Sequence, residues 1–205
     1  MGKEENKEME FWTQEEFQAF LECVADKPIS YYAFEILYWT GIREGELLAL
    51  TPADFNFEKK TLRINKSYQR LEGKDVITDP KTPKSNRTIV MPDFLAVEME
   101  NFISSLYGIR DDDRIFTISK SYLHHEMDRG AKLAGVKRIQ IHGLRHSHIS
   151  LLINLEFSAL AIGERVGHEA VDITYHYAHL FPTVQTDMAA QLETEREALV
   201  NVRKK

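Results

Sequence analysis

Residues 141–155 read IHGLRHSHISLLINL, and the spacing of their apolar residues predicts an amphipathic helix. Residues three and four apart share one face of a helix, which places His142, Arg145 and His146 together. The leucines and His148 lie on the opposite face, which is predicted to be the core side. An arginine fork grips two phosphate oxygens, and a nearby histidine exchanges a proton near neutral pH. The helix is therefore predicted to present a cationic, proton-exchanging group on one flank.

A second candidate segment, TGIREGELLAL, covers residues 40–50. Arg43 follows a glycine that ends the preceding helix, and it begins a short helix whose leucines pack inward. Glu46 lies three residues later on the same face and is predicted to orient Arg43. Taken alone, this pair is more typical of a surface ion pair, which stabilises a protein little.

The rest of the chain predicts a mainly α, α+β fold with one small antiparallel sheet inserted after the first arginine segment. Thr13 and Glu16 have the spacing of a capping box ahead of an apolar helical stripe. Short apolar runs within residues 61–91, separated by Gly73 and by prolines, predict the sheet. Further helices are predicted over residues 29–40, 44–50, 92–107, 122–134, 143–154, 158–166, 170–177 and 187–202, with a short extended piece over 114–117.

Composition restricts the class of protein. The 205 residues are 43% hydrophobic and 28% charged, as in folded globular chains. No apolar run is long enough to span a membrane, and the N-terminus lacks the apolar stretch of a secretory signal. The single cysteine, Cys23, excludes an internal disulfide framework and a multi-cysteine zinc site. A cytoplasmic protein without a membrane partner is expected.

The charge is distributed unevenly. A net charge of −6 argues mildly against a nucleic acid partner, because phosphate binding normally needs a basic surface. Residues 59–90 nevertheless hold nine lysines and arginines against three acidic residues, a local balance of +6. A hairpin with a solvated charged face accounts for this equally well when the stretch is taken alone. If the stretch binds DNA, the expected contacts are Lys66, Arg70, Lys84 and Arg87.

A third element lies towards the C-terminus, where His168 follows a glycine and Tyr177 comes nine residues later in YHYAH. Together the segments resemble the tyrosine recombinases, also called phage integrases, over about residues 11–190. That family carries Thr-Gly-hydrophobic-Arg-x-x-Glu, a lysine on a β-hairpin, His-x-Leu-Arg, Gly-His and Tyr-x-His. This chain matches those elements in order, residue type and spacing.

The resemblance implies a set of six catalytic residues and a role for each. They are Arg43, Lys81, His142, Arg145, His168 and Tyr177. The arginines are expected to bind the non-bridging phosphate oxygens, and the lysine to protonate the departing 5′-oxygen. The first histidine helps the tyrosine to lose its proton, and the second donates a hydrogen bond to the phosphate. The product is a 3′-phosphotyrosyl ester, and no metal or other cofactor is expected.

Several assignments have a neighbouring competitor. Tyr175 is two residues from Tyr177, but only the latter gives Tyr-x-His and the family's spacing from the Gly-His segment. Lys84 competes with Lys81, which is preferred because a Lys-Thr dipeptide usually marks the family's lysine. His179 is expected to hold the tyrosine segment in place. The aspartates at 111–113 are expected to form a solvated turn.

The resemblance also implies an organisation and partners. Residues 1–10 are expected to be a disordered or linker N-terminus, 11–186 the catalytic domain, and 187–205 a C-terminal helix or tail. The tail either packs within the chain or is exchanged between subunits. Expected partners are double-stranded DNA attachment sites, copies of the chain in a homotetramer on DNA, and an excisionase-type accessory factor. The free chain is expected to be a monomer. Family members normally carry DNA-binding modules ahead of this domain, and their expected absence predicts weak DNA binding.

Three other functions are compatible with parts of this pattern. A type-IB-like topoisomerase shares the arginines, the lysine and the tyrosine, and would relax DNA without exchanging strands. A metal-dependent phosphohydrolase would use His142, His146 and His168, although Arg145 between the first two would repel a cation. A non-catalytic DNA-binding or scaffold protein would have lost some of the six residues, all of which are present.

Overall fold

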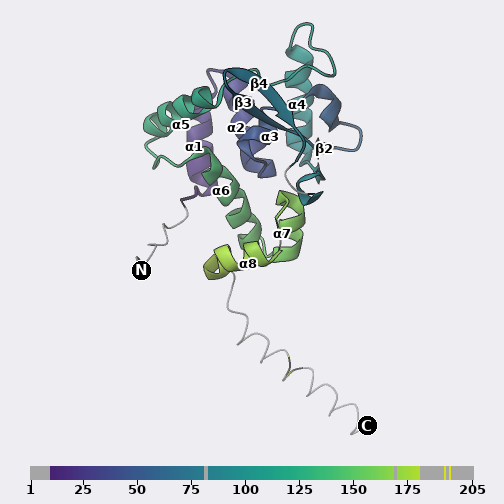
Figure 1. The fold of residues 1–205 in the computed structure, drawn as a ribbon. Coiled ribbons are helices and arrows are strands. Elements are labelled where there is room, and N and C mark those ends of the chain that lie inside the picture. The colour runs from purple at the N-terminus through teal and green to yellow at the C-terminus, as the bar shows by residue number, and fades with distance from the viewer. Residues whose placement is uncertain (1–9, 81–82, 169, 181–191, 193, 195–205) are drawn as a thin grey trace.

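The computed structural model describes residues 10–80, 83–168 and 170–180, with the isolated positions 192 and 194. The described chain is mainly helical, with two small antiparallel sheets, which confirms the predicted fold class (Figure 1). Within these ranges no helix combines the length and apolar character needed to cross a membrane. The helices are α1 Gln14–Val24, α2 Pro28–Thr40, α3 Glu44–Leu47, α4 Asp93–Ser105, α5 Lys120–Ala134, α6 Ile141–Asn154, α7 Ala159–Val166 and α8 Ala170–Tyr177.

The helix ends follow the local sequence signals. The Glu16 amide lies 3.3 Å from the Thr13 hydroxyl, and the Thr13 amide lies 2.9 Å from the Glu16 carboxylate, so the predicted capping box is confirmed. Helix α2 ends at Gly41, whose φ of +65° is left-handed. A side chain there would place its Cβ 2.6 Å from Cδ2 of His148, so glycine permits the close approach of α2 and α6.

The predicted antiparallel sheet is present as two separate sheets. Strands β1 (Phe55–Asn56), β2 (Thr61–Ile64) and β5 (Arg87–Val90) form one, in the order β1-β2-β5. Strands β3 (Ser67–Leu71) and β4 (Lys74–Thr78) form a hairpin whose two-residue turn has positive φ at Glu72 and Gly73. The extended piece predicted over 114–117 forms no strand; Ile115 and Phe116 are instead buried in an irregular connector.

The apolar core is divided into two clusters of very different size. The larger runs from Trp12 to Leu144 and includes side chains of α1 to α6. The smaller consists of Ile149, Ile153, Ile162, Val166, Ile173 and Tyr177. Figure 1 shows α6 running from the main helical body to the short helices α7 and α8. Helices α7 and α8 therefore pack with α6 around a small core of their own, and α7 also contacts β5.

Helix α6 differs from its predicted amphipathic pattern. On the flank that was expected to be free, Arg145 is only 1% exposed, whereas His142 is exposed and His146 is half-buried. Leu155, expected on the core side, is instead 58% exposed at the end of the helix. The predicted division into a core side and a free side is therefore wrong for Arg145 and Leu155, because α7 as well as α2 and α5 packs on α6.

Candidate active site

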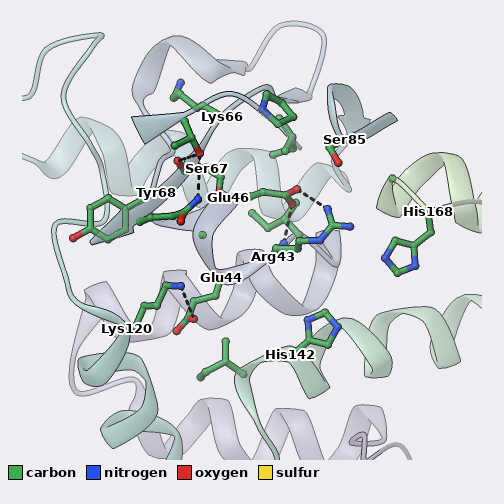
Figure 2. Close-up of a pocket in the computed structure, with 18 of the residues that line it drawn as sticks. Arg43, Glu44, Glu46, Lys66, Ser67, Tyr68, Ser85, Lys120, His142 and His168 are labelled. Atoms are coloured by element: carbon green, nitrogen blue, oxygen red, sulfur yellow. Dashed lines mark hydrogen bonds and ion pairs between the residues drawn. The ribbon is translucent and has the colours of Figure 1, made fainter. Parts of the chain in front are cut away.

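A cavity of about 980 Å³ lies between α3, the β3–β4 hairpin, α6 and the segment that joins α7 to α8 (Figure 2). Arg43, His142 and His168 all line it, and Figure 2 shows their side chains converging on one side. Lys66 and Lys84 line it as well. Three of the six predicted catalytic residues thus meet on one side of the cavity, where a guanidinium and two imidazole rings suit an anion such as a phosphate.

The Arg43 side chain is fixed by a buried carboxylate. Its Nη1 donates to Oε1 of Glu46 at 2.9 Å, and its backbone amide donates to Oε2 at 2.8 Å. Arg87 of β5 donates to the same two oxygens from Nη1 at 3.1 Å and from Nη2 at 2.9 Å. Burial alone would raise the pKa of Glu46, but the hydrogen bonds and charges of Arg87 and Arg43 lower it. The prediction that Glu46 orients Arg43 is confirmed.

Arg87 has a different environment from the one expected of a DNA contact. It is 9% exposed, and besides Glu46 it bonds to the carbonyls of Ser85 and Arg165, the latter at 2.9 Å from Nε. It therefore ties β5 to α3 and to the end of α7. Sequence reasoning missed this role because the residue belongs to a basic stretch. The available signal was the period of two in β5, which places Arg87 on the same face as the buried Ile89.

Arg145 is buried beside the cavity and does not line it. Its Nη1 donates to the Gly41 carbonyl at 2.6 Å, and its Nη2 donates to the Val166 carbonyl. Both carbonyls end helices, α2 and α7, and they adjoin Ile42 and Gly167, which do line the cavity. Burial and the charges of Arg43 and Arg87 lower the pKa of Arg145 to about 9. Its guanidinium therefore adds positive charge directly behind the cavity wall.

Tyr177 is also buried, at 3% exposed, and does not line the cavity. Its hydroxyl is hydrogen-bonded to Nδ1 of His146. The His146 ring lies edge-on to that of His142, with centroids 4.8 Å apart. Burial raises the pKa of Tyr177, and the charge of Arg145 opposes that rise. The competing Tyr175 is 81% exposed, so the two tyrosines have opposite environments.

The histidines of the site are held in the neutral form. Burial and the charges of Arg145 and Arg43 lower the pKa of His142 and that of His168, the latter to about 4. Burial, together with neighbouring His142, Arg145 and His176, lowers the pKa of His146 to about 4. Near pH 7 each ring therefore has one N–H donor and one acceptor nitrogen.

His148 is the core histidine that the sequence predicted. It is 2% exposed, and its Nε2 accepts a hydrogen bond from Nε of Arg165 at 3.0 Å. The other nitrogens of Arg165 donate to the carbonyls of Val90 and Trp39. This pair therefore fixes α7 against the main body and takes no place in the cavity.

The remaining basic residues have varied surroundings. Lys66 bonds to Asp54 and to the Thr51 hydroxyl, at 3.2 Å in the latter case, while it also lines the cavity. Arg70 and Lys84 are exposed. DNA contact by these residues stays a prediction. Other assignments lie outside the described residues: the position of Lys81, the side chain of His179, the helix predicted over 187–202 apart from positions 192 and 194, and residues 1–9 of the expected linker.

The described residues contain no group of three His, Cys, Asp or Glu side chains arranged to hold a metal ion. The three histidines weighed for a metal-dependent phosphohydrolase are therefore not such a group. The aspartates at 111–113 form a turn in which Arg110 pairs with Asp113 at 2.9 Å. Asp111 and Asp112 are exposed, so the predicted solvated turn is confirmed.

Comparison with known proteins places this geometry in a family. The profile of the phage integrase family matches residues 10–183. This chain belongs to the phage integrase family. It is 31% identical over 202 residues to the ICEBs1 integrase of Bacillus subtilis (strain 168), covering 91% of this chain and 55% of that protein. It is 25% identical over 213 residues to a XerC-like tyrosine recombinase of Caldanaerobacter subterraneus, covering 90% and 54%. The chain spans about half the length of these relatives.

Solved structures of integrases have the same fold. The Tn1549 transposon integrase, in complex with a circular intermediate DNA, matches with a TM-score of 0.76 at 22% identity. That match covers 95% of this chain and 68% of the other. The catalytic domain of bacteriophage HP1 integrase matches with a TM-score of 0.63 at 20% identity, covering 90% of this chain and 95% of that domain. The predicted resemblance to the tyrosine recombinases is thus confirmed for family and fold.

Proposed function

We propose that this chain is the catalytic part of a site-specific DNA recombinase that cleaves and rejoins DNA strands through a 3′-phosphotyrosyl ester on Tyr177. The observation that carries the proposal is the convergence of Arg43, His142 and His168 on one cavity, with Arg145 directly behind its wall. The buried hydroxyl of Tyr177 completes the set. It is hydrogen-bonded to His146, which lies on the same helix as His142. The integrases and tyrosine recombinases among the relatives support this reading.

The chemistry follows from the charges. A phosphodiester repels nucleophiles because its oxygens are negative, and fixed cations stabilise the additional charge of the transition state. Arg43 reaches the cavity and binds a non-bridging oxygen, while Arg145 supplies charge from behind the wall. The neutral ring of His168 donates a hydrogen bond to the phosphate.

The covalent step exchanges one ester for another. The Tyr177 oxygen forms a bond to phosphorus as the bond from phosphorus to the 5′-oxygen breaks. The neutral ring of His142 takes up the proton of the phenol, as the resemblance implies, and Lys81 is proposed to protonate the departing 5′-oxygen as general acid. Because the phosphotyrosyl ester keeps the energy of the broken bond, a 5′-hydroxyl of another strand can attack it and restore the tyrosine without ATP.

Several properties of the whole protein are proposed at the same level. Its role would be the integration and excision of a mobile element in the cytoplasm, at double-stranded DNA attachment sites. The active form would be a homotetramer on DNA, formed from free monomers, with an excisionase-type factor setting direction. Within this chain, residues 11–186 would form the catalytic domain, and 1–10 and 187–205 a linker and a C-terminal tail.

A suicide substrate tests the proposal. The full-length protein is incubated with EDTA and a nicked duplex that carries the attachment core of its own mobile element, and is then run on a denaturing gel. We expect a covalent protein–DNA band that Tyr177→Phe abolishes and Tyr175→Phe retains. A band in Tyr177→Phe, or no band from the wild type, would contradict the proposal. Relaxation of supercoiled DNA without strand exchange would instead indicate a topoisomerase.

A further inference from the structure

His146 stands between two residues of the proposed site. It lies on α6 one helical turn beyond His142, and its Nδ1 is hydrogen-bonded to the hydroxyl of Tyr177 on α8. His142 lines the cavity, whereas His146 and Tyr177 do not. The hydroxyl that must attack the phosphate is therefore held by a histidine to which the family resemblance gives no role.

The direction of this hydrogen bond depends on which nitrogen of the His146 ring carries a hydrogen. The buried phenol keeps its hydrogen, because burial raises the pKa of Tyr177. The charged and titratable groups that face His146 are His142 and Arg145 on its own helix and His176 and Tyr177 on α8. Burial, together with these neighbours, disfavours a second ring proton, so the ring is neutral. A neutral ring that carries its hydrogen on Nε2 accepts the phenol hydrogen at Nδ1.

We propose that His146 is the positioning residue for the nucleophile: its Nδ1 accepts the hydrogen of the Tyr177 hydroxyl and fixes the direction of the oxygen lone pairs. The inference rests on the proposed function of Tyr177 and goes beyond the resemblance, which assigns the tyrosine to His142 alone. A single fixed hydrogen bond suits this task because a phenol hydroxyl without a partner alternates between two orientations in the plane of its ring. Poor orientation of a reacting atom by about 1 Å slows a reaction on the order of 100-fold.

The hydrogen bond itself can be observed without any DNA. Histidine rings labelled with ¹⁵N report in NMR spectra which nitrogen carries the hydrogen and which accepts a bond. We expect His146 to be the Nε2–H form, with a Nδ1 signal that shifts in Tyr177→Phe and stays in place in Tyr175→Phe. The spectrum of His146→Asn identifies the signal among the 8 histidines of the chain. A Nδ1 signal that Tyr177→Phe leaves unchanged would overturn the inference.

Single-turnover cleavage of the nicked substrate by the full-length protein tests the role. His146→Ala should lower the cleavage rate about 100-fold while leaving the Kd for DNA unchanged. In His146→Asn the amide oxygen can occupy the place of Nδ1, so the rate should recover by about tenfold relative to alanine. The matched control is His176→Ala on α8, because that ring is exposed and bonds to the Asp172 carbonyl of its own helix. It should cleave within about threefold of the wild type.

The outcomes separate the inference from the proposed function. If the wild type forms no adduct on Tyr177, the proposed function fails, and there is no nucleophile for His146 to position. If the wild type forms the adduct and His146→Ala forms it at the same rate, the inference alone is overturned. It is also overturned if the His146→Ala, His146→Asn and His176→Ala variants all lose the same factor, because that pattern indicates general packing of α8.

Discussion

The two halves of the proposed site are attached to the protein in contrasting ways. Arg87 and Arg145 are each held by two or more hydrogen bonds, Arg87 by Glu46 and two carbonyls and Arg145 by the ends of two helices. The Arg43 guanidinium is paired with the buried Glu46. Tyr177, in contrast, sits on an eight-residue helix at the end of the fold. It is held there by the small apolar cluster and by one side-chain hydrogen bond to His146.

This difference matches the tasks of the two halves. Groups that stabilise a transition state by their charge work best when they are fixed in advance, since no free energy is then spent on orienting them during the reaction. Tyr177 is instead attached through the smaller of the two cores and through its hydrogen bond to His146. Elements with few buried contacts have low local stability. We therefore expect substitutions in the two halves to have different signatures.

The largest effect is expected from Arg145→Lys. A lysine keeps the charge but cannot reach the carbonyls of Gly41 and Val166 with the two arms of a guanidinium. We expect the cleavage rate to fall about 1000-fold, with a loss of about 1–2 kcal/mol in the free energy of unfolding. Single-turnover cleavage and urea unfolding measure the two quantities. If this variant cleaves within tenfold of the wild type, the hydrogen bonds of Arg145 to the two carbonyls are not needed for the reaction.

A second substitution tests the bracing itself. Arg87→Ala leaves the buried Glu46 carboxylate with Arg43 as its remaining ion-pair partner, and it leaves two carbonyls without their donor. Its free energy of unfolding should fall by about 3 kcal/mol. Arg63→Ala serves as the control. Arg63 is exposed, and its Nη2 lies 3.7 Å from Oδ1 of Asp54, too far for a hydrogen bond. Its removal should change the free energy of unfolding by less than about 0.5 kcal/mol. If the two variants lose the same stability in thermal or urea unfolding, the buried contacts of Arg87 stabilise the protein no more than an exposed ion pair does.

The attachment of α8, which carries Tyr177, is tested by opening a cavity in each of the two cores. Ile173→Ala in the small cluster should destabilise α8 by about 2 kcal/mol. Hydrogen exchange should then accelerate in α8 and leave the α2 amides unchanged. Leu47→Ala in the main core is the matched variant and should lower the global transition instead. If Ile173→Ala lowers the global transition as much as Leu47→Ala does, the two halves unfold as one unit.

The smallest expected effect is a pH dependence that belongs to the main body alone. Glu35 of α2 is 5% exposed, and burial, with the charge of Glu98, raises its pKa from 4.5 to about 7. The folded state therefore binds this proton more tightly than the unfolded state does. Ionisation of Glu35 lowers stability as the pH rises above 4.5, and the loss is complete above about 7.

Glu35→Gln removes this ionisation. The variant should be more stable than the wild type by about 1 kcal/mol at pH 8, and the difference should shrink towards pH 5. Urea unfolding at the two values measures it, with hydrogen exchange of α8 as the internal control. A stability difference that is the same at both pH values would contradict the assignment of the pH dependence to Glu35. A change in hydrogen exchange of α8 would show that α8 and the main body are energetically coupled.

Features that depend on neighbours along the chain were predictable from the sequence. The Thr13 capping box, the end of α2 at Gly41 and the pairing of Arg43 with Glu46 each involve residues within about one helical turn. The turn chemistry and the apolar period therefore determine them without reference to the rest of the fold.

Features that depend on distant contacts were not predictable in this way. The carbonyl that holds Arg145 is 104 positions away, the carboxylate that holds Arg87 is 41 away, and Tyr177 is 31 positions from His146. No local periodicity reports such distances. The six catalytic assignments came from the family resemblance, and the sequence had no means of indicating that Arg145 and Tyr177 lie outside the cavity.

The way Arg145 is held has a consequence for protein engineering. A carboxylate partner would cancel the charge of a buried guanidinium and compete with a phosphate for it. Here the counterpart is two carbonyls at the ends of α2 and α7, where the partial negative charges of helix dipoles are concentrated. The carbonyls stabilise the guanidinium without cancelling its charge, so most of its positive electric field still extends beyond these two partners. Transplanting it into another scaffold would therefore require two helices that terminate at the same point, and no exchange of side chains alone would reproduce it.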